Sequence, residues 1–348
     1  AKIEDNFSSD LPSQEQTSSM PSSPDWSITT TESEVYSLLR RLPVRKSPGS
    51  DGIPIKVYKF LADVLALPLS HIFNDCFKES TFPQVWKNGT MIPIPKSNPP
   101  SMDKLRLLPL LPTPAKLLER IVLKNTVRHF ETAFGNAQHG FRRCHSTTTA
   151  LVDLTDLLSH NMDDRSLFGT ALLSFDLSRA FDTLEHPLLL RSLANSGFPT
   201  RFIKWTSSYL SSRSTSLRVR GMLSPPFFLR RGVPQGAILG PALFCAFMGE
   251  LTAPNGLTSV TKYADDVYFS IKLTNSDLDA NREKIDSVVL YMRRWTEEHR
   301  LILNLAKSKM MVVTRNRSQI LQPLPHLIVS EMKVLGDMVS ENLSWKSH

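Results

Sequence analysis

The chain has 348 residues and a formal net charge of +8; 41% of its residues are hydrophobic and 21% are charged. These values are typical of a globular protein with a sizeable core and a polyanionic partner, and no apolar run reaches the roughly 18 residues that a membrane span needs. The cysteines are odd in number and far apart, which argues against a disulfide framework or a zinc site and favours buried free thiols in a reducing compartment, at Cys76, Cys144 and Cys245.

The N-terminal part differs from the rest in composition. Residues 1–34 carry one Lys against seven Asp or Glu, so the remainder is more basic than the total implies. A polar, acidic segment rich in Ser and Pro cannot bury enough apolar surface to fold, so residues 1–33 are predicted to be a disordered linker. Because the sequence begins with Ala, we expect a fragment of a longer protein.

The first ordered part is predicted to be mainly helical. One strand within it contains prolines. Because proline has no N–H to donate to a neighbouring strand, we expect this strand at the edge of a sheet. The expected elements are a helix beginning near Thr31, a basic turn-rich loop at 46–52, a helix at 54–78, the strand at 90–96 and a helix at 114–131.

The second part alternates strands and helices. In its last helix, spacings of three and four residues predict one apolar face, formed by Ile285, Val288, Met292, Trp295 and His299. The expected elements are a buried strand at 171–176, a helical region at 188–205, a tight turn at 232–236, a helix at 238–248, a hairpin around 263–266 and this helix at 283–299.

Three carboxylates stand at strand ends. Asp265 and Asp266 lie at or near the tip of the hairpin, and Asp176 ends an apolar strand. Adjacent like charges in an apolar setting repel each other, and a divalent cation removes that penalty. Taken alone, Asp176 could equally be a turn residue or a helix N-cap, and Asp182 is expected to cap the following helix. Together, the three carboxylates predict a two-metal site for phosphoryl transfer.

These motifs resemble the reverse transcriptases of non-LTR (LINE-like) retrotransposons. The resemblance covers about residues 34–348, and Tyr-Ala-Asp-Asp at 263–266 favours this family over viral RNA polymerases, whose centre is more often Gly-Asp-Asp. Eight motifs occur in the family's order, at 46–52, 92–96 with Arg106 and 116–120, 138–147, 175–182, 232–236, 263–266, 304–307 and 334–345.

The resemblance implies a role for each matching residue. Asp176, Asp265 and Asp266 would hold two Mg²⁺ ions, for which Mn²⁺ could substitute, with the Leu177 carbonyl as a main-chain ligand. Lys307 would act as a general acid beside the leaving pyrophosphate. The nucleotide-binding residues would be Lys96, Arg106, Phe181, Gln235, Gly236 and Tyr263, and the nucleic-acid contacts would come from Arg142, Arg143, Leu335 and Gly336.

Plainer roles remain open for several of these residues. Phe181, which would act as a steric gate against ribonucleotides, could be an ordinary core residue, and Lys96 and Lys307 could be solvated surface lysines. A salt bridge is the alternative for Arg142 and Arg143. Other runs of arginines could contact the phosphate backbone of a nucleic-acid duplex, or they could simply form a solvated surface. They lie at 40–41, 218–220, 230–231 and 293–294.

The implied fold is an α+β right-hand polymerase with an antiparallel palm sheet packed on helices and the thumb largely missing. Residues 34–165 would form the fingers and the start of the palm. Residues 166–348 would form the palm, with a helical fingers insertion at about 185–225, ending where a thumb should begin.

The implied activity is RNA-directed DNA synthesis from dNTPs on an RNA template and a DNA primer. The partners would include an endonuclease domain of the full-length protein and no membrane, and the location would be intracellular, in nucleus and cytoplasm, as a ribonucleoprotein. Departures from the family pattern occur after Arg106, at Ala237 and at Gly249-Glu250. The alternatives are a silent or domesticated copy that only binds nucleic acid, a group II intron-type reverse transcriptase, and a structural domain with chance motifs.

Overall fold

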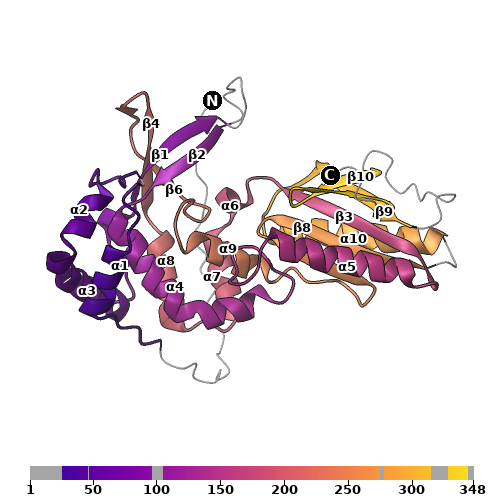
Figure 1. Ribbon diagram of the computed structural model, residues 1–348, viewed down its shortest axis with the longest axis horizontal. Coiled ribbons are helices and arrows are strands. Elements are labelled where there is room, and N and C mark those ends of the chain that lie inside the picture. Colours follow the sequence, from indigo (N-terminus) through magenta and orange to yellow (C-terminus); the bar gives the residue numbers. More distant parts are fainter. Residues whose placement is uncertain (1–25, 46, 96–104, 275–277, 315–327, 344–348) are drawn as a thin grey trace, which may run out of the picture.

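The computed structural model describes residues 26–45, 47–95, 105–274, 278–314 and 328–343. Most of the helices gather at one end of the molecule, and a long sheet with helices alongside it lies at the other (Figure 1). The helices are α1 Glu32–Arg40, α2 Ile55–Phe60, α3 Ala62–Lys78, the 3₁₀ helix η1 Gln84–Trp86, α4 Thr113–Phe134, α5 Thr147–Asp163, α6 Ala180–Thr183, α7 His186–Asn195, α8 Thr200–Leu210, α9 Gly240–Met248 and α10 Leu278–Glu298.

The strands form two larger sheets and a separate hairpin. They are β1 Asn88–Pro95, β2 Leu105–Leu110, β3 Leu167–Leu177, β4 Arg213–Val219, β5 Met222–Leu223, β6 Phe227–Leu229, β7 Thr258–Tyr263, β8 Asp266–Thr274, β9 Leu303–Val313, β10 Glu331–Val334 and β11 Asp337–Ser340.

The palm sheet has the strand order β7-β8-β3-β9 and is antiparallel throughout, as predicted. Its side chains alternate between two faces, and both faces are buried. Val267 and Phe269 belong to the main core with α9 and the apolar side of α10, whereas Tyr268 packs with Leu154 of α5 and with the β10–β11 hairpin. Figure 1 shows α5 and α10 running alongside this sheet.

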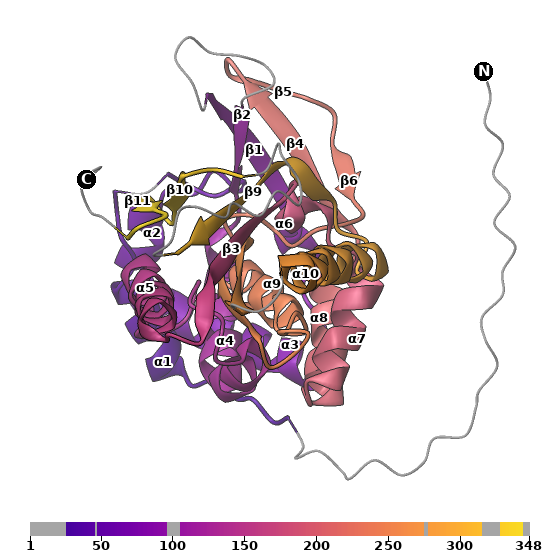
Figure 2. The ribbon, with the colours of Figure 1, turned by 90° about the vertical axis from the view of Figure 1, so that its right-hand side faces the viewer.

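The second sheet has the order β2-β1-β4-β5, with β6 also paired to β4, and it rises above the helices in Figure 2. The prediction that the proline-containing strand lies at an edge was wrong, because β1 lies between β2 and β4. The reason is local. Only residues 88–91 of β1 pair with β4, so Pro93 and Pro95 lie beyond the hydrogen bonds between these two strands. The N–H groups that these prolines lack are therefore not needed for pairing with β4.

Most of the predicted elements are present. Thr31 caps α1 by accepting a hydrogen bond from the Glu34 amide (3.2 Å). The expected helix at 54–78 is broken at Leu61 into α2 and α3. The segment at 185–225, expected to be helical, contains α7 and α8 but ends in β4, which joins the second sheet.

The three thiols are free, but only two of them are buried. Burial raises the pKa of Cys76 and of Cys245 to about 12, whereas Cys144 lies exposed in a turn, contrary to expectation. Among the helices that the structure describes, none is long and apolar enough to cross a membrane.

Candidate active site

Strand β3 and the β7–β8 hairpin bring the predicted carboxylates to the same end of the palm sheet. Phe175 pairs with Val267, and continuing that register by one residue sets Asp176 opposite Asp266. Tyr263 pairs with Asp266, so only Ala264 and Asp265 form the turn. The predicted hairpin tip is therefore confirmed, and the three carboxylates share one end of the sheet.

The charges of these carboxylates affect one another. Burial, with the Asp176 charge as a lesser cause, raises the pKa of Asp265. Burial, then the charges of Asp265 and Asp176, raises the pKa of Asp266 to about 6, although that side chain keeps an exposed part. Each of the two raised pKa values therefore has a neighbouring carboxylate among its causes.

The donors available here are carboxylate oxygens, the ligands that Mg²⁺ and Mn²⁺ prefer. Within the described ranges, no set of three or more Asp, Glu, His or Cys side chains is already gathered closely enough to hold a metal ion. Uncompensated negative charge at this end of the sheet is a penalty that a divalent cation would relieve.

The turn at the hairpin tip depends on a residue outside it. Ala264 has a positive φ of 56°, a left-handed conformation that costs a residue with a Cβ about 1 kcal/mol. The buried Gln138 side-chain oxygen accepts hydrogen bonds from the amides of Ala264 (2.9 Å) and Gly140 (2.8 Å). Gln138 therefore fixes the turn that carries Asp265.

Backbone contacts hold the same segment against the hairpin. The His139 amide donates to the Lys262 carbonyl (2.9 Å), and the Lys262 amide donates to the Ala137 carbonyl (2.7 Å). Gly140 is required by close packing, because a Cβ there would lie 2.4 Å from the Ala264 nitrogen. From this motif the sequence assigned nucleic-acid contacts only to Arg142 and Arg143, and the structure shows that Gln138 and His139 are bonded to the β7–β8 hairpin.

Helix α9 receives an acidic side chain at its N-terminus and a basic one at its C-terminus. Oε2 of the fully buried Glu119 of α4 accepts from the amides of Ile238 (2.6 Å) and Leu239 (3.0 Å). The buried Lys262 of β7 donates to the carbonyls of Met248 (2.7 Å) and Leu251 (2.8 Å). Both side chains satisfy end groups of the helix that would otherwise be unpaired, and burial raises the pKa of Glu119 and lowers that of Lys262 to about 8.

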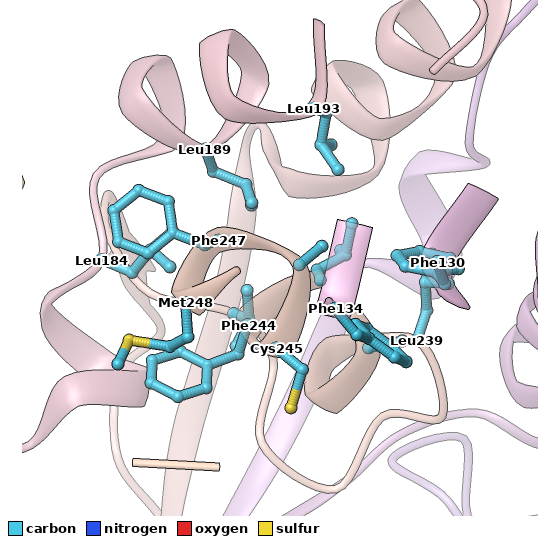
Figure 3. Close-up of a cluster of buried hydrophobic side chains, with 14 of the residues drawn as sticks. Phe130, Phe134, Leu184, Leu189, Leu193, Leu239, Phe244, Cys245, Phe247 and Met248 are labelled. Atoms are coloured by element: carbon cyan, nitrogen blue, oxygen red, sulfur yellow. The ribbon is translucent and has the colours of Figure 1, made fainter. Parts of the chain in front are cut away.

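The core around α9 is apolar on all sides. Figure 3 shows its side chains packed against those of α4 and α7. The cluster includes Phe130, Phe134, Leu189, Leu193, Phe244, Cys245, Phe247 and Met248. The unpaired amides and carbonyls at the ends of a helix buried in this way cannot form hydrogen bonds to water. Glu119 accepts from the amides and Lys262 donates to the carbonyls in place of water.

The turn at 232–236 is bonded to the segment that follows Asp176. The Val233 amide donates to the Phe181 carbonyl (2.9 Å), and the Gln235 side chain donates to Asp182. The prediction that Asp182 caps the next helix was wrong, because its carboxylate is the acceptor for Gln235 instead. Phe181 is half-buried and stacks on Phe244, with ring centroids 4.0 Å apart.

The two sheets meet at this turn. Gly236 has a φ of 70°, and a Cβ there would lie 3.1 Å from a ring carbon of Pro109 in β2. Arg106 lies on β2 with its backbone opposite Ile94, while Lys96 lies outside the described residues. The predicted nucleotide-binding residues 235 and 236 therefore lie where the second sheet meets the palm.

The remaining predicted residues lie around this end of the palm. Leu177 is the last residue of β3, Tyr263 the last of β7, and Lys307 is exposed in the part of β9 where the register with β3 shifts beside Asp176. Leu335 and Gly336 form the β10–β11 turn, and the Leu335 amide donates to the Tyr268 hydroxyl (3.4 Å).

Arg142 takes the salt-bridge alternative in this structure. Its Nε lies 2.5 Å from Glu131, and its Nη1 donates to the Gly135 carbonyl (2.9 Å), so it fixes the loop after α4. Arg143 is exposed. Contact of either arginine with a template stays a prediction.

Comparison with known proteins identifies the family. Residues 94–339 match the model described as reverse transcriptase (RNA-dependent DNA polymerase). The chain is 30% identical over 275 residues to the protein named Probable RNA-directed DNA polymerase from transposon BS of Drosophila melanogaster, covering 75% of this chain and 30% of that protein. It is 29% identical over 285 residues to the RNA-directed DNA polymerase from mobile element jockey of the same species, covering 79% and 31%.

The chain thus spans about a third of the length of the curated relatives it matches. Among solved structures, apo telomerase from Candida tropicalis truncated from its C-terminal domain matches with a TM-score of 0.51 at 13% identity. That match covers 75% of this chain and 55% of the telomerase. It confirms the predicted polymerase fold, while the domain boundaries stay a prediction.

Replacing Gln138 by Ala should destabilise the protein by about 1–3 kcal/mol, because the buried amides of Ala264 and Gly140 lose their acceptor. Urea denaturation measures this change. The matched control is Gln84→Ala, which removes an exposed hydrogen bond and should cost under about 0.5 kcal/mol. Equal losses in the two variants would contradict the supporting role of Gln138.

Replacing Asp266 by Asn should stabilise the metal-free protein. Because the folded-state pKa is raised, the penalty for ionising Asp266 is absent below about pH 4 and develops fully as the pH rises through about 6. We expect the Tm in EDTA to rise by at least about 2 °C near pH 7.5 and to be unchanged near pH 4.

The control for that measurement is Asp156→Asn, which changes an exposed carboxylate on α5. Adding Mg²⁺ should raise the Tm of the unmodified protein and of the control but not that of Asp266→Asn. A lower Tm for Asp266→Asn in EDTA near pH 7.5 would show that the carboxylates do not repel one another.

Proposed function

Since the chain belongs to the reverse transcriptase (RNA-dependent DNA polymerase) family, we propose that it is the polymerase part of a non-LTR retrotransposon protein and copies RNA into DNA. The single observation that carries the proposal is the meeting of Asp176, Asp265 and Asp266 at one end of the palm sheet, where each raised pKa has a neighbouring carboxylate among its causes.

The proposed roles follow from the placement of these residues. Asp176, Asp265 and Asp266 hold divalent ions, Mg²⁺ by preference and Mn²⁺ as a substitute, with help from the Leu177 carbonyl. When bound, the ions supply Lewis-acid activation of the primer 3′-hydroxyl and neutralise charge on the phosphates. Lys307, exposed beside Asp176, supplies a proton to the departing pyrophosphate.

The nucleotide would be bound between the palm and the second sheet. Gln235 and Gly236 supply one wall, because their turn lies against both Asp182 and Pro109. Phe181 supports the sugar from below, and its ring is held in place by Phe244. Arg106, Lys96 and Tyr263 complete the proposed set.

The relatives are about three times longer than the matched region, and an endonuclease domain is our proposal for part of the additional length. The proposed location is intracellular, in nucleus and cytoplasm, in a ribonucleoprotein with the element's RNA. Leu335, Gly336 and Arg143 are the proposed nucleic-acid contacts on the palm side.

The test is primer extension on an RNA template with Mg²⁺ and dNTPs, using a protein extended to the length of its relatives. Asp265→Asn should lower the rate by at least about 100-fold while primer–template binding persists. Extension that does not depend on Asp265 would refute the proposed site. Binding without any extension by the unmodified protein would favour a silent copy.

Phe181→Leu should relax the choice of sugar, since it removes the rigid ring that would exclude a ribose 2′-hydroxyl. The ratio of NTP to dNTP incorporation should rise by about 10- to 100-fold, an amount in line with discrimination between substrates that differ in one hydroxyl. Phe60→Leu is the matched control, because it makes the same change at a ring that is 80% exposed on α2 and is not part of the proposed sugar site. An equal effect of both changes would indicate a purely structural role for Phe181.

A further inference from the structure

Phe141 is an aromatic residue that none of the roles described above uses. It lies between Gly140, which packs against the amide of Ala264 in the catalytic turn, and Arg142, which is paired with Glu131. The Phe141 side chain is 58% exposed, so folding buries little of its ring. A single exposed apolar side chain is ordinary in a folded protein, but the backbone that carries this one is not.

The backbone of Phe141 is strained. Its φ of 55° lies in the left-handed region, which is unfavourable for a residue with a Cβ and is an outlier for a bulky side chain. Contacts on both sides hold it there. The Gly140 amide donates to the Gln138 side-chain oxygen (2.8 Å), and Nη1 of Arg142 donates to the Gly135 carbonyl (2.9 Å). Strain that the surroundings impose in this way is common at functional sites.

The ring of Phe141 contacts the ring that is proposed to lie beneath the nucleotide sugar. The centroids of Phe141 and Phe181 are 6.3 Å apart and their planes are 77° apart, a favourable edge-to-face arrangement. Phe181 also stacks on Phe244, at 4.0 Å and 22°. Phe244 is buried and Phe181 is half-buried. Phe181 therefore touches one ring of the core and one ring of the segment that supports the catalytic turn.

These two contacts restrain Phe181 in different ways. A ring that excludes a hydroxyl group by its bulk does so only while it cannot move aside. Stacking on Phe244 resists movement across the ring planes, but offset stacks tolerate sliding along them. The Phe141 ring stands at a large angle to Phe181, so it resists movement in another direction. Without Phe141, the ring of Phe181 could shift and leave room for a ribose 2′-hydroxyl.

We propose that Phe141 is a positioning residue that holds the ring of Phe181 in place and thereby strengthens the choice of dNTPs over NTPs. This inference rests on the proposed function, because it takes Phe181 as the ring beneath the sugar. The strained backbone at 141 is explained by this role, since it directs an otherwise exposed ring toward Phe181.

The test is single-nucleotide primer extension, with kcat/KM measured separately for a dNTP and the matching NTP. Phe141→Asn removes the ring but keeps a residue that tolerates the left-handed conformation. Its kcat/KM for the NTP should rise by about 3- to 10-fold, the factor that corresponds to the loss of one aromatic pair. The value for the dNTP should not rise. General damage to the fold lowers both values, so it cannot produce this result.

Two further variants serve as controls. Phe141→Tyr keeps an aromatic ring at the same position and should retain the discrimination between the two sugars. Phe60→Asn makes the same change as Phe141→Asn at a ring that is 80% exposed on α2, and it should leave the ratio of NTP to dNTP incorporation unaltered.

A double variant tests whether Phe141 acts through Phe181. Because the contact is already lost in Phe181→Leu, adding Phe141→Asn should not raise the ratio of NTP to dNTP incorporation further. Urea denaturation gives a second readout that needs no reaction. The shifts in urea midpoint of the two single variants should sum to more than the shift of the double variant, because each single change removes the same contact.

The possible failures can be told apart. An unaltered ratio for Phe141→Asn, equal changes for Phe141→Asn and Phe60→Asn, or additive effects in the double variant would overturn this inference and leave the proposed function intact. If Phe181→Leu itself left the ratio unaltered, or if the unmodified protein extended no primer, the proposed function would fail and this inference would fail with it.

Discussion

The left-handed turn at Ala264 is the constraint on which the catalytic end of the palm depends. A two-residue connection between β7 and β8 places Asp265 between the strands, and it requires a positive φ that alanine adopts only at a cost. The Gln138 carboxamide offsets that cost by accepting from Ala264 and Gly140 together. The segment before α5 therefore supports the proposed active site, although it lies more than a hundred residues away in the sequence.

Helix α9 extends this scaffold into the core. Its N-terminus is bound by Glu119 and its C-terminus by Lys262, and Lys262 lies on the same strand as Tyr263. Burying a charge is costly unless hydrogen bonds satisfy it, and each of these groups has two backbone partners. Because Glu119 lies on α4 and Lys262 on β7, these contacts fix α4, α9 and β7 relative to one another.

Patterns of short range predicted much of this structure. Alternation predicted β3 and the β7–β8 hairpin, and helical spacing predicted the buried side of α10. The sequence did not reveal the partners of polar side chains, such as Gln235 for Asp182, because those partners are distant in the chain. The interior position of β1 was missed for the same reason, since β4 follows it by more than a hundred residues.

The stretch at 186–249 contains no Asp or Glu, so its buried arginine finds its partners in other ways. Arg213 needs no acid nearby in sequence. Its Nη1 donates to the Tyr209 carbonyl (2.9 Å), and its guanidinium carbon lies 4.9 Å from the centre of the Tyr209 ring. The positive charge of Arg213 also lowers the pKa of the buried Glu119 on α4, against the larger effect of burial, which raises it.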